Sequence, residues 1–394
     1  MKTELIKKEN RNILQTYKRH HLIVDKAEGV HIYDVEGNEY LDFLSGIAVN
    51  VLGHSHRKII QAVEKQMSRY THLSNYFYQD AQIEFAEKLI DISGYDKVFL
   101  ANSGTEAMEG AIKLVRRWGN QNGKKEIIAF TGGFHGRTYG ALSLMDKPHY
   151  KDMMGPFLNN MKVIEYNNIE ALRANINENT AALLFEFIQG EGGIRPADRD
   201  WSNEIFRLRD EFGFKVIADE IQAGSGRSGR FFSFEHYNLR PDVVTLAKGI
   251  GGGLPLGCLL VDENLSDVFE RGMHGTTFGG NALACVAGSV VIEELENGIM
   301  ENAENVGNYL ERRLLEIQKE FPDKVLEVRG MGLIRGLLLS FDAARLVSAL
   351  LERRVVTNSA SGYVLRILPP LIITESDVDV FIVALRYCLS DMKI

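Results

Sequence analysis

Two short apolar runs, Lys215-Val-Ile-Ala-Asp219 and Asp242-Val-Val-Thr-Leu-Ala247, decide the fold class of this sequence. Three similar apolar runs precede them, at residues 97–101, 126–130 and 181–185. Amphipathic stretches lie between the runs, at about 105–120 and 201–213. Apolar strands that alternate with helical patterns are typical of a mostly parallel sheet covered by helices. The runs are apolar at almost every position, which indicates burial on both sheet faces. We therefore predict an α/β fold with its sheet within residues 50–285.

Both ends of the chain lack this alternation. Residues 31–43 are predicted to form a hairpin that turns at residues 36–38, and the C-terminal part contains a long helical stretch near 302–321 and a strand-rich tail. The 394 residues also exceed the roughly 250 to 300 that one hydrophobic core usually supports. We expect a large domain of residues 50–285 and a smaller α+β domain formed by residues 1–49 and 286–394.

Composition narrows the class of protein. The 45 basic and 53 acidic residues are spread along the chain, and the net charge of −8 argues against binding to nucleic acid or an anionic membrane. No apolar run approaches the about 18 residues of a membrane helix, and the first ten residues lack the apolar core of a secretion signal. The three cysteines lack CxxC spacing, and no histidine pair has ligands at metal-binding spacing. We expect a cytoplasmic protein without a metal site that acts on small molecules.

Chemically functional residues follow the predicted strands, at the sheet edge where α/β proteins bind ligands. Asn102-Ser-Gly-Thr-Glu106 opens a helix, and its free N–H groups with the hydroxyls of Ser103 and Thr105 could hold a phosphate, or could only cap the helix. After residue 130, Phe134 could stack on a flat ring and Arg137 could bind a carboxylate in bidentate fashion. Alternatively, Phe134 is a core residue and Arg137 lies on the surface.

The two runs that decide the fold both lead into ionisable residues. Asp219 ends the first run and Glu220 follows it. At the mouth of an apolar strand a carboxylate is costly unless it meets a cation. Lys248 follows the second and is surrounded by small and apolar residues, so desolvation would lower the pKa of its amine from about 10.4. Such an amine can act as a Schiff-base nucleophile and a general base, whereas an exposed strand-end lysine is the alternative. Residues 224–229 match a dinucleotide-binding pattern, but they do not join a strand directly to a helix, so we reject that interpretation.

A phosphate cradle, an aromatic residue, a buried acid and an amine at one sheet edge are the parts that pyridoxal 5'-phosphate (PLP) requires. Eight segments, some of which contain the residues named above, match a known family: residues 47–54, 101–107, 134–138, 188–193, 219–222, 247–249, 274–281 and 328–332. Through them the sequence resembles the class III (ornithine-type) aminotransferases, and among these the acetylornithine aminotransferases. The resemblance implies a PLP-dependent enzyme of fold type I.

The resemblance also implies roles for individual residues. Ser103, Gly104 and Thr105 would bind the phosphate of PLP. Phe134 would stack on its ring, while Asp219 pairs with the ring nitrogen and Gln222 approaches the ring hydroxyl. Lys248 would bond the aldehyde, which makes Lys248 and Asp219 the catalytic residues. Thr277 would reach the phosphate of the neighbouring subunit's cofactor, and this implies a homodimer with shared active sites.

Substrate contacts follow from the same resemblance. Arg137, with Thr276 nearby, would hold the carboxylate of an N-acylated donor, and Arg366 would hold 2-oxoglutarate or glutamate. Glu191 would be a gate that neutralises Arg366 while the donor is bound. The implied reaction transfers the terminal amino group of N-acetyl-L-ornithine to 2-oxoglutarate, giving N-acetyl-L-glutamate 5-semialdehyde and L-glutamate in arginine biosynthesis.

Other reactions remain open at the level of sequence. Ornithine δ-aminotransferases usually carry a tyrosine where Ile47 stands, and an apolar residue suits an acylated amine better than a free ammonium. N-succinylornithine is not separated from N-acetylornithine by any residue. Aminomutases and decarboxylating enzymes share the fold, although Arg366 and Glu191 argue against an aminomutase. A nucleotide-binding or non-enzymatic α/β protein is the third class of alternative.

Overall fold

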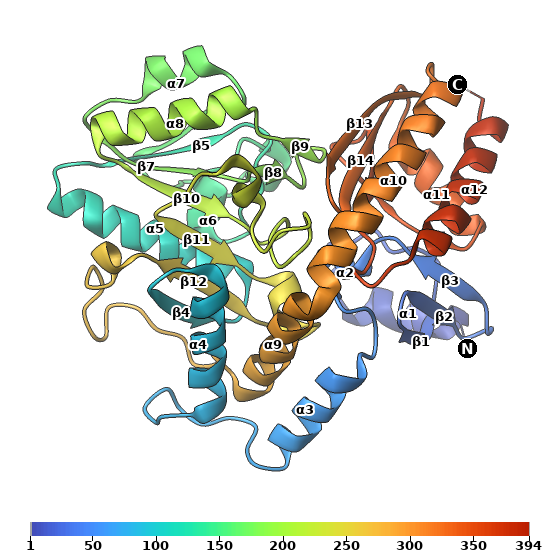
Figure 1. Cartoon of the computed structure of the whole chain (residues 1–394), viewed down its shortest axis with the longest axis horizontal. Coiled ribbons are helices and arrows are strands. Elements are labelled where there is room, and N and C mark those ends of the chain that lie inside the picture. Colours follow the sequence, from blue (N-terminus) through green and yellow to red (C-terminus); the bar gives the residue numbers. More distant parts are fainter. Residues whose placement is uncertain (1, 394) are drawn as a thin grey trace.

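Seven strands form the central sheet, in the order β4-β12-β11-β10-β7-β5-β6, in the computed structural model, which describes residues 2–393. Their bounds are β4 Lys97–Ala101, β5 Glu126–Phe130, β6 Met161–Ile164, β7 Thr180–Phe185, β10 Lys215–Asp219, β11 Val243–Leu246 and β12 Gly257–Val261. β4, β5 and β10 have the predicted bounds, β7 begins one residue earlier than predicted, and β11 is one residue shorter than predicted at each end. The sheet forms the larger lobe on the left of Figure 1.

The strand directions confirm a mostly parallel sheet with one exception. β12 runs antiparallel to both β11 and β4, while β10 is parallel to β11 and β7, and β5 is parallel to β7 and β6. The sequence prediction missed β6 and β12. Every residue of β7 and β11 is buried, so the predicted burial on both faces is confirmed.

Alternate residues of each strand face two separate hydrophobic cores. In β7, Leu183 and Phe185 belong to one core, whereas Ala182 and Leu184 belong to the other. The helix α8 (Arg199–Phe212) packs on the first side through Trp201, and α5 (Gly104–Gln121) covers the second. This arrangement follows from the two-residue period of a strand, since each face must be covered by its own helices. The helices therefore leave the carboxyl edge of the sheet open.

The second lobe contains residues from both ends of the chain (Figure 1). Its strands are β1 Val24–Glu28, β2 His31–Asp34, β3 Glu39–Asp42, β13 Val325–Met331, β14 Ile334–Leu339, β15 Val355–Val356, β16 Asn358–Ala360 and β17 Val364–Ile367, and its helices are α10 Met300–Glu320, α11 Ala343–Glu352 and α12 Glu375–Asp391. β2 and β3 form the predicted hairpin, and β3 pairs in parallel with β15. This pairing supports a smaller domain built from both ends, although the division stays a prediction: the boundary after residue 285 falls within α9 (Ala282–Glu294).

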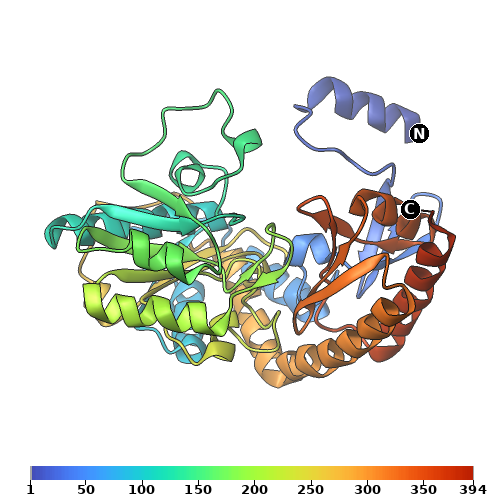
Figure 2. The ribbon, with the colours of Figure 1, turned by 90° about the horizontal axis from the view of Figure 1, so that it is seen from above.

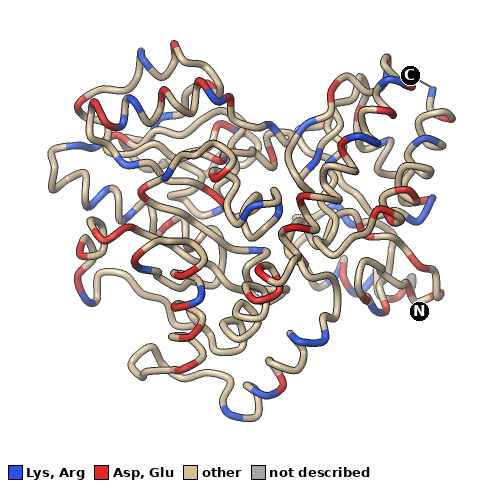
Figure 3. Tube along the Cα trace, viewed as in Figure 1, with Lys and Arg blue, Asp and Glu red and all other residues tan. Residues whose placement is uncertain are grey.

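The remaining elements complete the two lobes and the segments between them. They are α1 Lys2–Asn12, α2 Ser45–Ala48, α3 Arg57–Met67, α4 Asp80–Ser93, α6 Tyr139–Ser143, α7 Ile169–Asn175, the pair β8 Ile188–Gln189 and β9 Arg195–Pro196, and short helical turns at Pro148–Tyr150, Ser233–Tyr237, Lys248–Gly251, Glu263–Leu265 and Leu295–Ile299. Figure 2 shows α1 standing away from the body of the molecule. Acidic and basic residues are interspersed along the trace in Figure 3. No helix within residues 2–393 is long and apolar enough to cross a membrane.

Candidate active site

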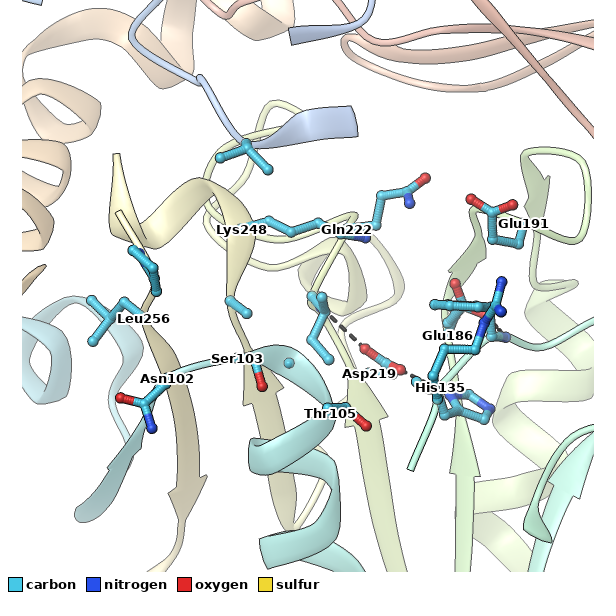
Figure 4. Close-up of a pocket in the computed structure, with 18 of the residues that line it drawn as sticks. Asn102, Ser103, Thr105, His135, Glu186, Glu191, Asp219, Gln222, Lys248 and Leu256 are labelled. Carbon is cyan, nitrogen blue, oxygen red and sulfur yellow. Dashed lines mark hydrogen bonds and ion pairs between the residues drawn. The ribbon is translucent and has the colours of Figure 1, made fainter. Parts of the chain in front are cut away.

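A cavity of about 460 Å³ lies at the carboxyl edge of the central sheet. Segments that follow β4, β5, β7, β10 and β11 line it, as expected where parallel strands end together. Nine of the residues predicted from the sequence contribute to its wall: Ser103, Gly104, Thr105, Phe134, Arg137, Glu191, Asp219, Gln222 and Lys248. Figure 4 shows Lys248 extending toward Gln222, with Asp219 and His135 facing each other.

The N-terminus of α5 forms one end of the cavity. Ser103 is the N-cap, and its hydroxyl accepts a hydrogen bond from the Glu106 amide at 3.3 Å. The first turn of a helix presents unpaired N–H groups and the positive end of the helix dipole, which favour an anion. A Cβ atom at Gly136 would lie 2.2 Å from the Thr105 hydroxyl oxygen, so the glycine keeps this end open. The segment is therefore both a helix cap and a possible phosphate cradle.

Asp219 lies at the base of the cavity against a histidine. Its Oδ2 is 2.8 Å from His135 Nδ1, and the two side chains are 3% and 1% exposed. The Ile221 amide donates to the other carboxylate oxygen at 3.1 Å. The sequence argument required a cation beside this carboxylate; the structure places the His135 imidazole there, a partner that sequence reasoning did not assign. No sequence spacing signals the pair, because Asp219 ends β10 whereas His135 lies in the segment after β5.

The carboxyl group of the neighbouring Glu220 has a different set of partners. Its carboxylate accepts hydrogen bonds from the Ser233 hydroxyl at 2.6 Å, the Ser233 amide at 2.9 Å and the Phe234 amide at 3.3 Å. The partners are thus neutral donors rather than a cation. Burial raises the pKa of Glu220 to about 8.

Glu186 is a second site residue that the sequence reasoning missed. Its carboxylate accepts hydrogen bonds from the amides of Phe134 and Gly190, both at 3.0 Å. Burial, together with the negative charge of Asp219, raises the pKa of Glu186 above its ordinary value. Glu186 follows β7 directly, so the rule that selected the other strand-end residues could have found it.

Lys248 begins a short helical turn and has a left-handed backbone with φ of 50°. This conformation is strained for a residue with a side chain and is often found at functional sites. Burial lowers the pKa of the Lys248 amine, the Arg366 guanidinium lowers it further, and the charges of Asp219 and Glu191 oppose these effects. The amine is thus desolvated as the sequence suggested, and the alternative of an exposed lysine is wrong.

Arg366, on β17 in the smaller lobe, does not itself line the cavity but contacts two residues that do, Glu191 and Gln222. It is 2% exposed, its guanidinium donates to the Glu191 carboxylate and to Gln222 Oε1 at 3.3 Å, and its Nε donates to Asn358 Oδ1 at 3.0 Å. Burial acts to raise the pKa of Glu191, but Arg366 outweighs it and holds that pKa below its ordinary value. Residues 175 positions apart in the sequence therefore form an ion pair across the two lobes.

Of the other predicted substrate contacts, Arg137 lines the cavity, whereas Thr276 does not. Arg137 is exposed, and its guanidinium stacks on the Tyr150 ring with a centroid distance of 3.7 Å. The Thr276 hydroxyl accepts a hydrogen bond from Asn102 Nδ2 at 2.9 Å. Thr277 is exposed and does not line the cavity of its own chain.

The residues present fit PLP. The α5 N-terminus suits its phosphate, Phe134 offers an aromatic face, Asp219 offers a buried carboxylate for the ring nitrogen, and Lys248 offers an amine of lowered pKa for the aldehyde. Within residues 2–393, no group of three or more acidic, histidine or cysteine side chains is placed to hold a metal ion. The fold and this cavity define a PLP-dependent transferase of fold type I.

Comparison with known proteins narrows this class. A family model described as aminotransferase class-III matches residues 13–389. The acetylornithine aminotransferase of Archaeoglobus fulgidus is 41% identical over 375 residues, covering 95% of this chain and 97% of the relative. The ornithine aminotransferase of Toxoplasma gondii, with PLP partly occupying its active site, superimposes with a TM-score of 0.94 at 28% identity, covering 99% of this chain and 94% of the other. For the acetylornithine aminotransferase of Elizabethkingia anophelis the TM-score is 0.89 at 31% identity, with 99% of each chain covered.

The chain belongs to the class III aminotransferase family. It is a PLP-dependent aminotransferase with small-molecule substrates, as the sequence predicted. The alternatives of a nucleotide-binding or non-enzymatic protein are thereby set aside.

Proposed function

We propose that the enzyme transfers the terminal amino group of N-acetyl-L-ornithine to 2-oxoglutarate, giving N-acetyl-L-glutamate 5-semialdehyde and L-glutamate, a step of arginine biosynthesis. Relatives named acetylornithine aminotransferase, 39 to 42% identical over almost the whole chain, support this substrate. The observation that carries the proposal is the Arg366–Glu191 ion pair at the cavity. Glu191 neutralises the Arg366 guanidinium while the two are in contact, and the guanidinium can bind a substrate carboxylate when Glu191 moves away. A donor without a second carboxylate and an acceptor with one can then share the same site.

The chemistry assigns distinct tasks to the residues at the base of the cavity. Bound PLP supplies an electron-accepting ring. Asp219 holds a proton on the ring nitrogen by its charge, and His135 keeps that carboxylate oriented. Lys248 Nζ would hold the cofactor through its aldehyde and, once free, would move the proton of the donor carbon, a role that its lowered pKa favours.

Substrate binding is assigned to three charged residues: Arg137 and Glu191, which line the cavity, and Arg366, which contacts Glu191. Arg137, held against the Tyr150 ring, binds the carboxylate of the acylated donor with Thr276 nearby. Arg366 binds the carboxylate of 2-oxoglutarate once Glu191 has moved away. Ile47, 38% exposed, offers an apolar surface that favours an acylated amine over a free ammonium.

The enzyme is proposed to act as a homodimer. Thr277 is exposed, and beside it lie four exposed aromatic residues, Tyr76, Phe77, Tyr78 and Phe278, which we call the aromatic patch. Asn75 joins the two segments, since its amide donates to the carbonyls of Thr276 and Gly279, each at 3.2 Å. An exposed apolar patch of this kind favours an interface, which would bring Thr277 to the partner's cofactor. The cytoplasmic location expected from the sequence stays a prediction.

The proposal is tested by glutamate formation from 2-oxoglutarate with four donors compared side by side: N-acetylornithine, N-succinylornithine, ornithine and 4-aminobutyrate. We expect an N-acylated ornithine to exceed ornithine in kcat/KM by at least about tenfold, because the acyl group fills apolar surface that the free ammonium does not. Lys248→Ala should abolish the activity. A preference for free ornithine would contradict the proposed substrate, and no glutamate from any donor would contradict the reaction.

A further inference from the structure

The proposed function requires two positions of the Glu191 carboxylate, one on Arg366 and one away from it, and the structure shows the first. In this state the Glu191 carboxylate lies against the Arg366 guanidinium. A dicarboxylate substrate that takes Arg366 must displace Glu191 in a half-buried place where an unpaired carboxylate is costly. The displaced carboxylate therefore needs a second cation. This argument rests on the function proposed above.

Lys147 already lies beside Glu191. Its Nζ donates a hydrogen bond to the main-chain carbonyl of Glu191 at 3.2 Å. The Lys147 side chain is half-buried, and burial lowers the pKa of its amine. The negative charge of Glu191 is the largest of the nearby charges that raise this pKa. Three cations act on the Glu191 carboxylate: Arg366, Lys147 and Lys248. Because the Lys248 amine is needed to move the proton of the reacting carbon in both halves of the reaction, Lys147 remains as the alternative partner.

The backbone around Glu191 is fixed at several points. The Gly190 amide donates to Glu186 at 3.0 Å, and Gln189 Nε2 donates to the Thr131 carbonyl at 2.9 Å. A Cβ atom at Gly190 would lie 2.2 Å from Gln222 Oε1, so the turn is also tightly packed. Glu191 can therefore change partner by rotating its side chain while the main chain stays in place.

We propose that Lys147 receives the Glu191 carboxylate when a dicarboxylate substrate occupies Arg366. Lys147 is then a positioning residue for one half of the reaction only. In the donor half, Glu191 stays on Arg366 and Lys147 has no part. In the 2-oxoglutarate half, Lys147 lowers the cost of moving Glu191 away.

The two half-reactions can be measured separately on the holoenzyme from the change in cofactor absorbance, with the donor alone or with 2-oxoglutarate alone. For Lys147→Met we expect kcat/KM of the 2-oxoglutarate half to fall by about tenfold, the effect of losing one charged hydrogen bond. The donor half should change by less than about twofold on the same scale. Lys147→Arg should restore most of the loss because it retains the charge.

Two controls separate this role from a structural one. Lys151→Met removes a lysine of the same segment whose Nζ donates to the Met145 carbonyl at 3.0 Å, and both half-reactions should stay at the wild-type rate. In a Glu191→Gln background there is no carboxylate to move, so Lys147→Met should have no further effect.

Equal losses in both half-reactions, or an effect of Lys147→Met that persists in the Glu191→Gln background, would overturn the role of Lys147. A wild-type holoenzyme that reacts with neither substrate would overturn the proposed function and this inference with it. A wild type that reacts with both, together with a selective loss in Lys147→Met, supports both.

Discussion

Asp219 has to remain charged in a place that is almost closed to water. We predict that Asp219→Ala lowers kcat by about 10²- to 10³-fold, the usual effect of losing one preorganised electrostatic contact. Asp219 is the last residue of β10, a strand paired on both sides with β7 and β11, so the melting temperature should change little by comparison. Turnover and thermal unfolding measured on the same preparation test this prediction. Near-normal turnover would refute the role of Asp219.

His135 should act through Asp219. Replacing it with leucine removes a hydrogen bond to a charged group, and we expect kcat to fall by roughly ten- to hundredfold. The pH titration of the cofactor absorbance should also shift, because Asp219 would lose the partner that orients it. His135→Asn retains a donor and should lose less. If leucine and asparagine variants both keep the wild-type titration, His135 has only a packing role.

At the residue scale, the sequence revealed those groups whose chemistry can be read from their position after a strand. Asp219 and Lys248 stand out because a charged residue directly follows an apolar run. His135 and Glu186 did not stand out, because their importance comes from contacts with residues 84 and 52 positions away. The pairing of Glu191 with Arg366 came from family resemblance, and no local pattern contains it.

Among the elements, β12 was the strand whose absence from the sequence prediction mattered most. It follows a glycine-rich run, and its Gly257 passes behind the start of α5: a Cβ atom there would lie 2.3 Å from the Ser103 carbonyl oxygen. Length and apolarity alone do not separate a five-residue buried strand from a buried loop. β12 runs antiparallel to β11 because only a short segment, which contains Lys248, connects the two strands. The hydrophobic periodicity of the sequence does not reveal this direction.

We predict that Gly257→Ala displaces the start of α5 and weakens the phosphate cradle. Overpacking of this kind costs about 1 to 3 kcal/mol, and the affinity for PLP should fall together with the melting temperature. Titration of the apoenzyme with PLP and thermal unfolding measure the two effects. The control is Gly123→Ala, at an exposed turn where a Cβ atom meets nothing within 4 Å but a φ of 73° strains an alanine, so this variant should lower the melting temperature and leave the affinity for PLP unchanged. Unchanged PLP affinity in Gly257→Ala would contradict the proposed link between β12 and the cradle.

For the molecule as a whole, Glu220 should make stability depend on pH. Burial raises its pKa from the ordinary 4.5 to about 8, so the folded protein binds a proton that the unfolded chain has released. The resulting stability is fully present below about pH 4.5 and is lost as the pH rises to about 8, with an upper limit of about 5 kcal/mol. The melting temperature of wild type should therefore fall relative to that of Glu220→Gln over this range. Parallel pH profiles would contradict the assignment.

Assembly is the second property at this scale. Replacing Phe77 and Tyr78 of the aromatic patch with glutamate should convert the proposed dimer to a monomer, since charges in the centre of an apolar interface are strongly unfavourable. Sedimentation or light scattering gives the mass, and activity should be lost with the dimer if Thr277 completes the partner's site. Val383→Glu on α12, at another exposed apolar position, is the control. A double variant that remains an active dimer would contradict this interface.

The sequence could predict two lobes from chain length, but not the way they meet. Arg366 on β17 and Glu191 after β8 belong to different lobes, and their contact depends on how α9 and α10 join those lobes (Figure 1). Local periodicity contains no information on this relative orientation. The ion pair on which the proposed gate depends is therefore a property of the whole molecule rather than of either motif.

The most direct test of the account follows the nitrogen atom itself. N-acetylornithine labelled with ¹⁵N at the terminal amine is incubated with the holoenzyme and 2-oxoglutarate, and the products are analysed by mass spectrometry. We predict ¹⁵N-labelled glutamate in equal amount to the aldehyde product, and none with Lys248→Ala. Unlabelled glutamate, or labelled ammonia without glutamate, would contradict amino transfer at this site.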